Sequence, residues 1–93
     1  MLSIEPIDFS KVKKEERDKE ICRLGMIAEL DAVSLYEQLA ASTDNKALKT
    51  ILLDIAKEEK THAGEFQALL LKIDREQARE LEKGKKEVEE KTK

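Results

Sequence analysis

The chain has 93 residues, a net charge of −3 at pH 7, 42% charged residues and only 3% aromatic ones. This length predicts a single domain, and abundant Glu, Lys, Leu and Ala favour long helices over sheets. Interleaved charges of both signs argue against nucleic acid as a main partner. No apolar run approaches the roughly 18 residues of a membrane span. We therefore expect an all-α, cytoplasmic protein that binds neither nucleic acid nor membrane.

The first half of the chain predicts a lead-in followed by a long helix. Residues 1–12 are expected to be extended, because Pro6 is unfavourable inside a helix. A helical pattern then covers residues 13–41. The polar run Ser-Thr-Asp-Asn at 42–45 predicts a loop that ends this helix.

The second half predicts two more helical segments. Thr43 or Asp44 is the expected N-cap of a helix over residues 46–73. Asp74 offers a cap for a charged segment over 75–90, with an interruption at Gly84. This last segment is either a solvated helix supported by i,i+4 ion pairs or a frayed one.

The four-residue loop predicts that the two long helices form an antiparallel hairpin. The apolar residues of the first helix cover an arc of roughly 200°, about twice what a surface helix needs. One partner helix cannot cover this arc, so the hairpin is expected to pack against a second chain. The stripe at its centre consists of Ile21, Leu24, Ala28, Ala32, Leu35 and Leu39, and Cys22, Met26, Val33 and Ala40 widen it.

Two polar residues interrupt the apolar stripe of the second helix. At about 100° per residue, Glu59 and His62 fall inside that stripe, between Ile55 and Phe66. An ionised carboxylate in a helix interface costs several kcal/mol unless it is paired or bound to a metal. The Glu-x-x-His spacing is the one used in di-iron carboxylate bundles.

The first helix offers complementary residues. Glu29 and Tyr36 lie one heptad apart at the flank of its apolar stripe. The midpoint of positions 29 and 59 is 44, within the loop, so Glu29 and Glu59 should lie level across the hairpin. One chain thus supplies two carboxylates and one imidazole, which is half of the four-carboxylate, two-histidine set of a bundle di-iron site. A two-fold dimer would complete the site and cover the excess apolar arc.

The runs IAELDAVSLYEQLA and ILLDIAKEEKTHAGEF resemble the encapsulated ferritins, the ferritin-like di-iron proteins associated with encapsulin nanocompartments, over residues 18–75. The resemblance implies that residues 1–93 form one ferritin-like hairpin domain, which dimerises into a four-helix bundle and assembles into a ring. It implies a ferroxidase centre with two irons per dimer. By position, the resemblance makes Glu29, Glu59 and His62 metal ligands, places Tyr36 close to the metals and puts Asp31 on the iron access route.

The same resemblance implies an encapsulin shell protein as partner and a location inside its nanocompartment. The chain ends in VEEKTK, which is unlike the mildly apolar targeting tails of cargo members. Two explanations stay open: a cargo protein without its tail, or a domain fused to the shell protein.

The sequence is thus interpreted as a ferroxidase that oxidises Fe(II) with O₂ and feeds iron storage. One alternative is a rubrerythrin-like, peroxide-reducing di-metal protein, against which the absence of a CxxC centre counts. Another is a metal-free helical interaction module in which Glu29, Glu59 and His62 fix the register. Tyr36 has a packing alternative to its metal-proximal role, and Cys22 is interpreted as a small core residue.

Overall fold

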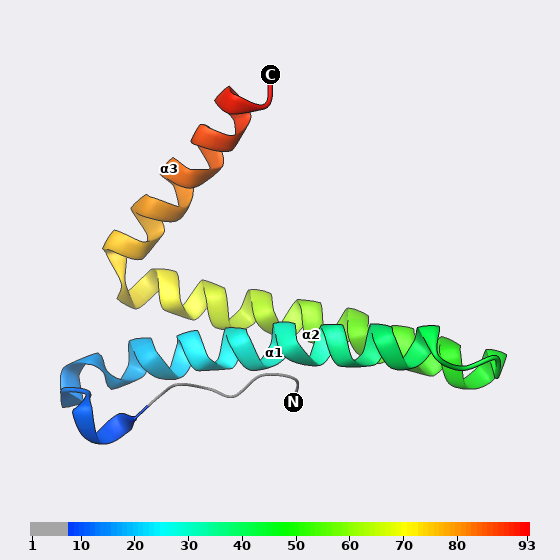
Figure 1. The fold of residues 1–93 in the computed structure, drawn as a ribbon. Coiled ribbons are helices and arrows are strands. Elements are labelled where there is room, and N and C mark those ends of the chain that lie inside the picture. Colours follow the sequence, from blue (N-terminus) through cyan, green and yellow to red (C-terminus); the bar gives the residue numbers. More distant parts are fainter. Residues whose placement is uncertain (1–7) are drawn as a thin grey trace.

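The computed structural model describes residues 8–93 and contains three α-helices, α1 (Arg17–Ala41), α2 (Lys46–Ile73) and α3 (Arg75–Lys91). Two short 3₁₀ turns, Phe9–Lys11 and Lys14–Glu16, precede α1. No strand occurs among these described residues, and the prediction of an all-α chain is confirmed. In Figure 1, α1 and α2 lie side by side as a long hairpin, and α3 rises from the end of α2.

The segment before α1 differs from the extended lead-in that the sequence predicts. The Asp8 carboxylate accepts hydrogen bonds from the backbone N–H and the hydroxyl of Ser10, at 3.0 and 2.6 Å, and caps the first 3₁₀ turn. The second turn leads directly into α1, which begins at Arg17 rather than at residue 13. A 3₁₀ turn is common at a helix N-terminus. The predicted extension at residues 1–7, with Pro6, lies outside the described residues.

The hairpin loop has its predicted position but a different cap. The Asn45 side chain, rather than that of Thr43 or Asp44, accepts the Leu48 N–H at 2.9 Å and caps α2. The Thr43 hydroxyl accepts the Asn45 N–H at 3.1 Å and so shapes the loop before the cap. Asparagine is among the best N-cap residues, and it stands directly before the first helical residue.

The seam between α1 and α2 is made of small and medium-sized apolar residues. The buried residues of α1 are Cys22, Val33 and Ala40, and those of α2 are Ala56, Ala63 and Leu70. The seam therefore follows the edge of the predicted stripe of α1 rather than its centre. Large apolar residues consequently remain outside the seam.

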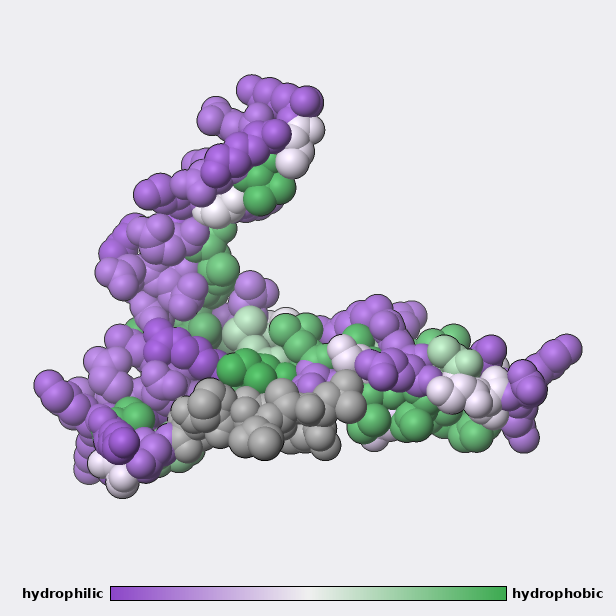
Figure 2. Space-filling model, viewed as in Figure 1, coloured by the Kyte–Doolittle hydropathy of each residue, from purple (hydrophilic) through white to green (hydrophobic). Residues whose placement is uncertain are grey.

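Five of these large residues form what we call the outer apolar face: Ile21, Leu39, Ile51, Leu69 and Ile73, each 44–57% exposed. Ile21 and Leu39 are separated by five full helical turns, as are Ile51 and Leu69, so each pair shares one side of its helix. Ile21, Leu69 and Ile73 together line a hollow of about 290 Å³, which places α1 and α2 residues on the same side of the hairpin. Figure 2 shows hydrophobic surface along the hairpin, in contrast to the largely hydrophilic α3.

The elbow between α2 and α3 is held by Asp74, which is only 9% exposed. One of its carboxylate oxygens accepts the Gln77 N–H at 3.0 Å and caps α3, as predicted. The other oxygen forms a 2.8 Å ion pair with Arg23 of α1, which also pairs with Glu20. A single side chain thus starts α3 and ties it to α1.

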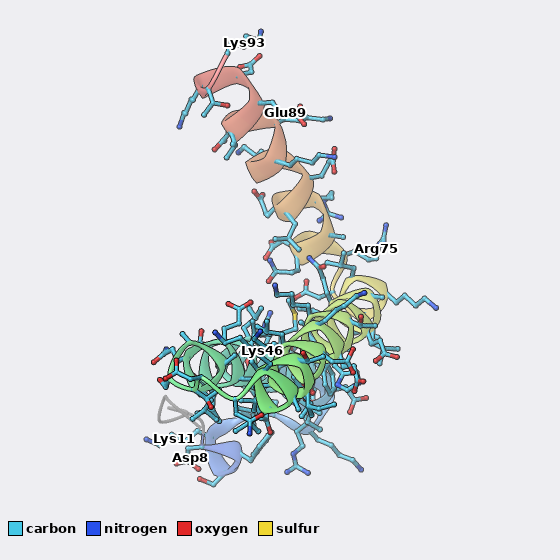
Figure 3. The ribbon with its side chains drawn as sticks, turned by 90° about the vertical axis from the view of Figure 1, so that its right-hand side faces the viewer. Asp8, Lys11, Lys46, Arg75, Glu89 and Lys93 are labelled. Atoms are coloured by element: carbon cyan, nitrogen blue, oxygen red, sulfur yellow. The ribbon has the colours of Figure 1, made fainter. Side chains whose placement is uncertain are left out.

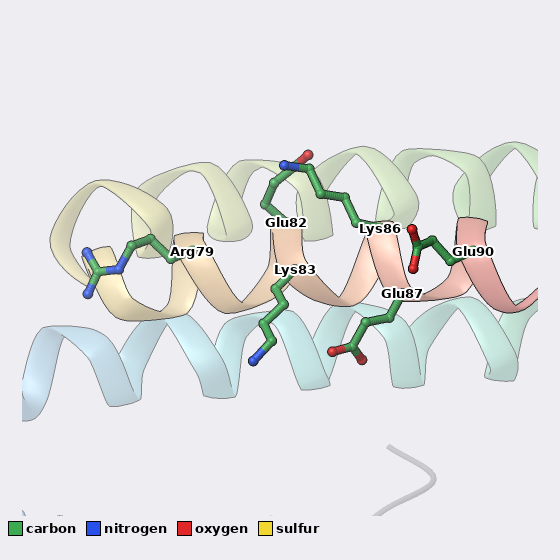
Figure 4. Close-up of a pocket in the computed structure, with 6 residues that line it drawn as sticks. All are labelled: Arg79, Glu82, Lys83, Lys86, Glu87 and Glu90. Atoms are coloured by element: carbon green, nitrogen blue, oxygen red, sulfur yellow. The ribbon is translucent and has the colours of Figure 1, made fainter.

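Helix α3 runs without a break through Gly84, contrary to the predicted interruption. Side chains project from it on all sides (Figure 3), but no ion pair joins two α3 residues within the described part of the chain. A hollow of about 530 Å³ is lined by α3 residues alone. Figure 4 shows its charged lining: Arg79, Glu82, Lys83, Lys86, Glu87 and Glu90.

The chain is more open than a compact domain. Its radius of gyration is 16.4 Å, compared with about 12 Å for a compact domain of this length. None of the described helices is long and apolar enough to cross a membrane. The combination of a thin seam and an uncovered apolar face is consistent with the expectation of a second chain.

Candidate metal centre

The structure brings together Glu29, Glu59 and His62, the three ligands that the sequence predicts. Each offers one ligand atom, and these atoms lie within 4.8 Å of one another. Glu29 comes from the middle of α1, and Glu59 and His62 come from consecutive turns of α2. Within the described residues no other group of three or more His, Cys, Asp or Glu side chains has this geometry.

The distances inside the cluster suit a shared metal ion better than direct hydrogen bonds. His62 Nδ1 lies 3.4 Å from Glu59 Oε2 and 3.5 Å from Glu29 Oε2. These separations are long for an N–H···O hydrogen bond, which is about 2.9–3.0 Å. Ligand atoms about 2.1 Å from one octahedral ion are separated by about 3–4 Å. The two distances from His62 therefore fit a shared ion, and the cluster has the mixed oxygen and nitrogen donors of a transition-metal site.

Burial divides the cluster into a protected and an open part. The side chains of Glu29 and Glu59 are each 20% exposed, whereas that of His62 is 45% exposed. His62 lies about three turns after Ile51 and about two turns before Leu69, so it belongs to the same side of α2 as the outer apolar face. The cluster thus opens onto the surface that a second chain is expected to cover.

The other predicted residues lie outside this cluster. Half-buried Tyr36 follows Glu29 by two turns of α1, about 10 Å along the helix axis. The Cα–Cβ bonds of an α-helix tilt toward its N-terminus, which is the direction of Glu29 from Tyr36. Asp31 points roughly 200° around α1 from Glu29, and it is engaged in an interaction of its own. Cys22 is a buried free thiol in the α1–α2 seam.

One contact beside the cluster was not predicted from the sequence. Lys60, which the helical pattern places on the solvated side of α2, forms a 3.1 Å ion pair with Glu37 of α1. Both side chains are about half exposed, so this pair contributes at most about 1 kcal/mol to stability. The opposite charges of Lys60 and Glu37, on facing edges of the two helices, could have predicted this ion pair.

Comparison with known proteins identifies the family. A family model described as EncFtn-like matches residues 5–89. The chain belongs to the EncFtn-like family. Its predicted resemblance to encapsulated ferritins is thereby confirmed.

Two curated relatives and one solved structure extend this result. The chain is 52% identical over 94 residues to a "Ferritin-like-encapsulin shell fusion protein" of Pyrococcus furiosus. This match covers 99% of this chain and 27% of the relative. The chain is also 40% identical over 72 residues to the "Encapsulin nanocompartment cargo protein EncC" of Myxococcus xanthus. This match covers 74% of this chain and 55% of that protein. It thus spans about a quarter of the first relative and about half of the second.

The solved structure is the crystal structure of the encapsulated ferritin domain from Pyrococcus furiosus. It is 51% identical to this EncFtn-like chain, and it superimposes with a TM-score of 0.82 over 97% of this chain and 94% of that one. The hairpin and the projecting third helix are therefore the fold of an encapsulated ferritin domain.

Proposed function

We propose that this protein is a ferroxidase that oxidises Fe(II) with O₂ at a site completed by two copies of the chain. The observation that supports it best is the convergence of Glu29, Glu59 and His62 within 4.8 Å on the open side of the hairpin. Membership of the EncFtn-like family adds a ferritin-like context to this cluster.

The number of ligands argues for a shared site. A di-iron bundle site takes four carboxylates and two imidazoles, and one chain supplies half of this set. A two-fold axis beside His62 would bring the second half into place, since an isologous interface presents the same residues from both sides. The same contact would cover the outer apolar face, and we expect about two irons per pair of chains.

The ligand chemistry suits iron as a substrate in both oxidation states. Carboxylate oxygens are hard ligands that favour Fe(III), whereas the imidazole nitrogen keeps affinity for Fe(II). Two Fe(II) ions give up one electron each, and O₂ takes up these two electrons with two protons to form H₂O₂. The apolar residues around His62 would exclude bulk water from the centre once a second chain covers them.

Two further residues have proposed roles at the edge of this centre. Tyr36 follows Glu29 by two turns of α1 and is proposed to lie close to the metals in the assembled site. Asp31 is proposed to guide Fe(II) toward the centre from the outer side of α1. Neither residue belongs to the three-residue cluster, so we expect their replacement to slow the reaction without abolishing metal binding.

The relatives suggest where the reaction takes place. One is named as a fusion with an encapsulin shell, and the other as an encapsulin cargo protein. We propose that this chain also works inside an encapsulin nanocompartment in the cytoplasm, as a ring of dimers. The shell would then hold the oxidised iron.

The test compares two matched carboxylate-to-amide variants, with ferric absorbance followed after O₂ is added to anaerobic, Fe(II)-loaded protein. Glu59→Gln is expected to slow oxidation at least about 100-fold. Even the replacement of a residue that only holds a metal ligand in place lowers metal affinity or activity by about 10–100-fold. Glu37→Gln removes only the exposed ion pair to Lys60 and should oxidise iron like the wild type. Equal rates for all three proteins would contradict the proposal.

The same preparation distinguishes the two alternative functions. Peroxide consumption faster than O₂ consumption would favour a rubrerythrin-like activity. An interaction module would ignore iron, and replacing Glu29 and Glu59 together by glutamine would strengthen its dimer, because two buried charges are removed.

A further inference from the structure

Gly25 stands in the interior of α1, where glycine is among the least favourable residues. A backbone reason for it is absent, because no glycine of the described chain has a positive φ. All three glycines of the sequence lie in helices. The reason for a glycine at position 25 must therefore lie in the side chains that surround it.

The space beside Gly25 is filled by the ring of Phe66 from α2. A Cβ at position 25 would lie 2.7 Å from Cδ1 and Cε1 of Phe66 and 2.8 Å from its Cγ. Carbon atoms in contact are normally about 3.5–4.0 Å apart. At Gly64 and Gly84, by contrast, a Cβ would meet nothing within 4 Å. Only at Gly25 does the missing side chain make room for a neighbour.

This contact lies next to the metal cluster on both helices. Glu29 follows Gly25 by four residues, and His62 precedes Phe66 by four, so each pair consists of neighbours on one helix face. The Phe66 ring against the Gly25 backbone thus forms the layer of the hairpin adjacent to Glu29 and His62. It sets how closely α1 and α2 approach at that layer.

We infer that Gly25 and Phe66 are a positioning pair for the metal centre, fixing the separation of Glu29 on α1 from His62 and Glu59 on α2. The inference rests on the proposed function, since it assigns a role toward the metal that these three residues would hold. Neither Gly25 nor Phe66 is a ligand. They act through the spacing of the helices.

The expected consequence of a methyl group at position 25 follows from the distances. To move from 2.7 Å to an ordinary contact of about 3.5 Å, the ring or the helices must shift by about 0.8 Å. Metal–ligand distances in a functional site vary by only about 0.2 Å. The shift either displaces the ring of Phe66, which is an i,i+4 neighbour of His62, or moves Glu29 away from α2. Both changes would alter the spacing of the ligands.

The experiment measures Co(II) binding to the full chain by titration and by visible absorption, alongside thermal unfolding. Gly25→Ala is expected to weaken Co(II) binding by about 10- to 100-fold, the usual cost of losing a supporting contact, and to change the absorption spectrum. Gly64→Ala is the matched control and should bind Co(II) like the wild type. The double variant Gly25→Ala/Phe66→Leu, with a smaller side chain at 66, should regain most of the affinity and the wild-type spectrum.

Unchanged Co(II) affinity and spectrum in folded Gly25→Ala would overturn the inference while leaving the proposed function intact. A lower melting temperature without a change in affinity would assign the pair a purely structural role and would also overturn it. If Gly25→Ala does not fold, the double variant decides, because the inference requires it to fold and bind. A wild-type protein that binds no metal would refute the proposed function, and the inference with it.

Discussion

Leu69→Ala is expected to weaken self-association by about 30-fold. Complete burial of a leucine side chain contributes about 1.5–3 kcal/mol, and Leu69 is still 54% exposed in the single chain. Covering it in a dimer would therefore contribute about 1 kcal/mol per chain. A two-fold interface counts this contribution twice, and about 2 kcal/mol corresponds to roughly 30-fold in the dissociation constant.

Leu53→Ala is the matched control for this prediction. Leu53 is 48% exposed on the same helix, but it points about 160° around α2 from Leu69. Sedimentation velocity over a range of protein concentrations measures both dissociation constants. We expect the dissociation constant to change less than about threefold for Leu53→Ala, because an exposed surface substitution usually costs under 0.5 kcal/mol. Equal effects of the two substitutions, or no effect of Leu69→Ala, would refute the assignment of the dimer to the outer apolar face.

The geometry of the α2–α3 elbow is expected to depend on Asp74. Asp74→Asn is expected to keep α3 helical, because asparagine also caps helices well, but to free its orientation by removing the ion pair to Arg23; Asp74→Ala should lose both. Distances between spin labels at Lys46 and Glu89, in a Cys22→Ala background, should broaden in both variants, whereas helicity by circular dichroism should fall only in Asp74→Ala. An unchanged distance distribution in Asp74→Asn would contradict this role. The elbow should also respond to acid. The hydrogen bond from the Gln77 N–H, followed by the charges of Lys19 and Arg23, holds the pKa of Asp74 below its usual value of 3.8. The stabilisation by the Asp74 carboxylate is thus fully present above pH 3.8. It is lost as the pH falls through the pKa that Asp74 has in the folded chain, which is lower. The free energies of unfolding of the wild type and Asp74→Asn should therefore differ at neutral pH and become equal in acid. A difference that does not change with pH would contradict this role of the Asp74 carboxylate.

Much of the fold follows from local pattern. Composition and periodicity predict helices, and the four polar residues at 42–45 predict the hairpin loop. The predicted N-cap of α2 was wrong because Thr43, Asp44 and Asn45 are three adjacent residues that can each cap a helix. Only the position of the first helical turn selects among them. The interruption at Gly84 was wrong because one glycine costs a helix only about 1 kcal/mol.

The site was predictable as far as it depends on antiparallel geometry. Glu29 and Glu59 lie level because they are equidistant from the loop, and His62 follows Glu59 on the same face. The rotation of the two helices about their axes is not encoded locally, since an apolar arc of roughly 200° does not say which edge forms the seam. Contacts that depend on this rotation, such as Phe66 on Gly25 and Arg23 with Asp74, therefore emerge only from the structure.

Native mass spectrometry of the anaerobic protein decides whether two chains share one iron site. Spectra recorded before and after addition of Fe(II) report both the number of chains and the number of metal ions in each assembly. We expect assemblies with an even number of chains that take up about two irons per pair of chains. A monomer that binds iron by itself, or an oligomer that takes up none, would contradict it.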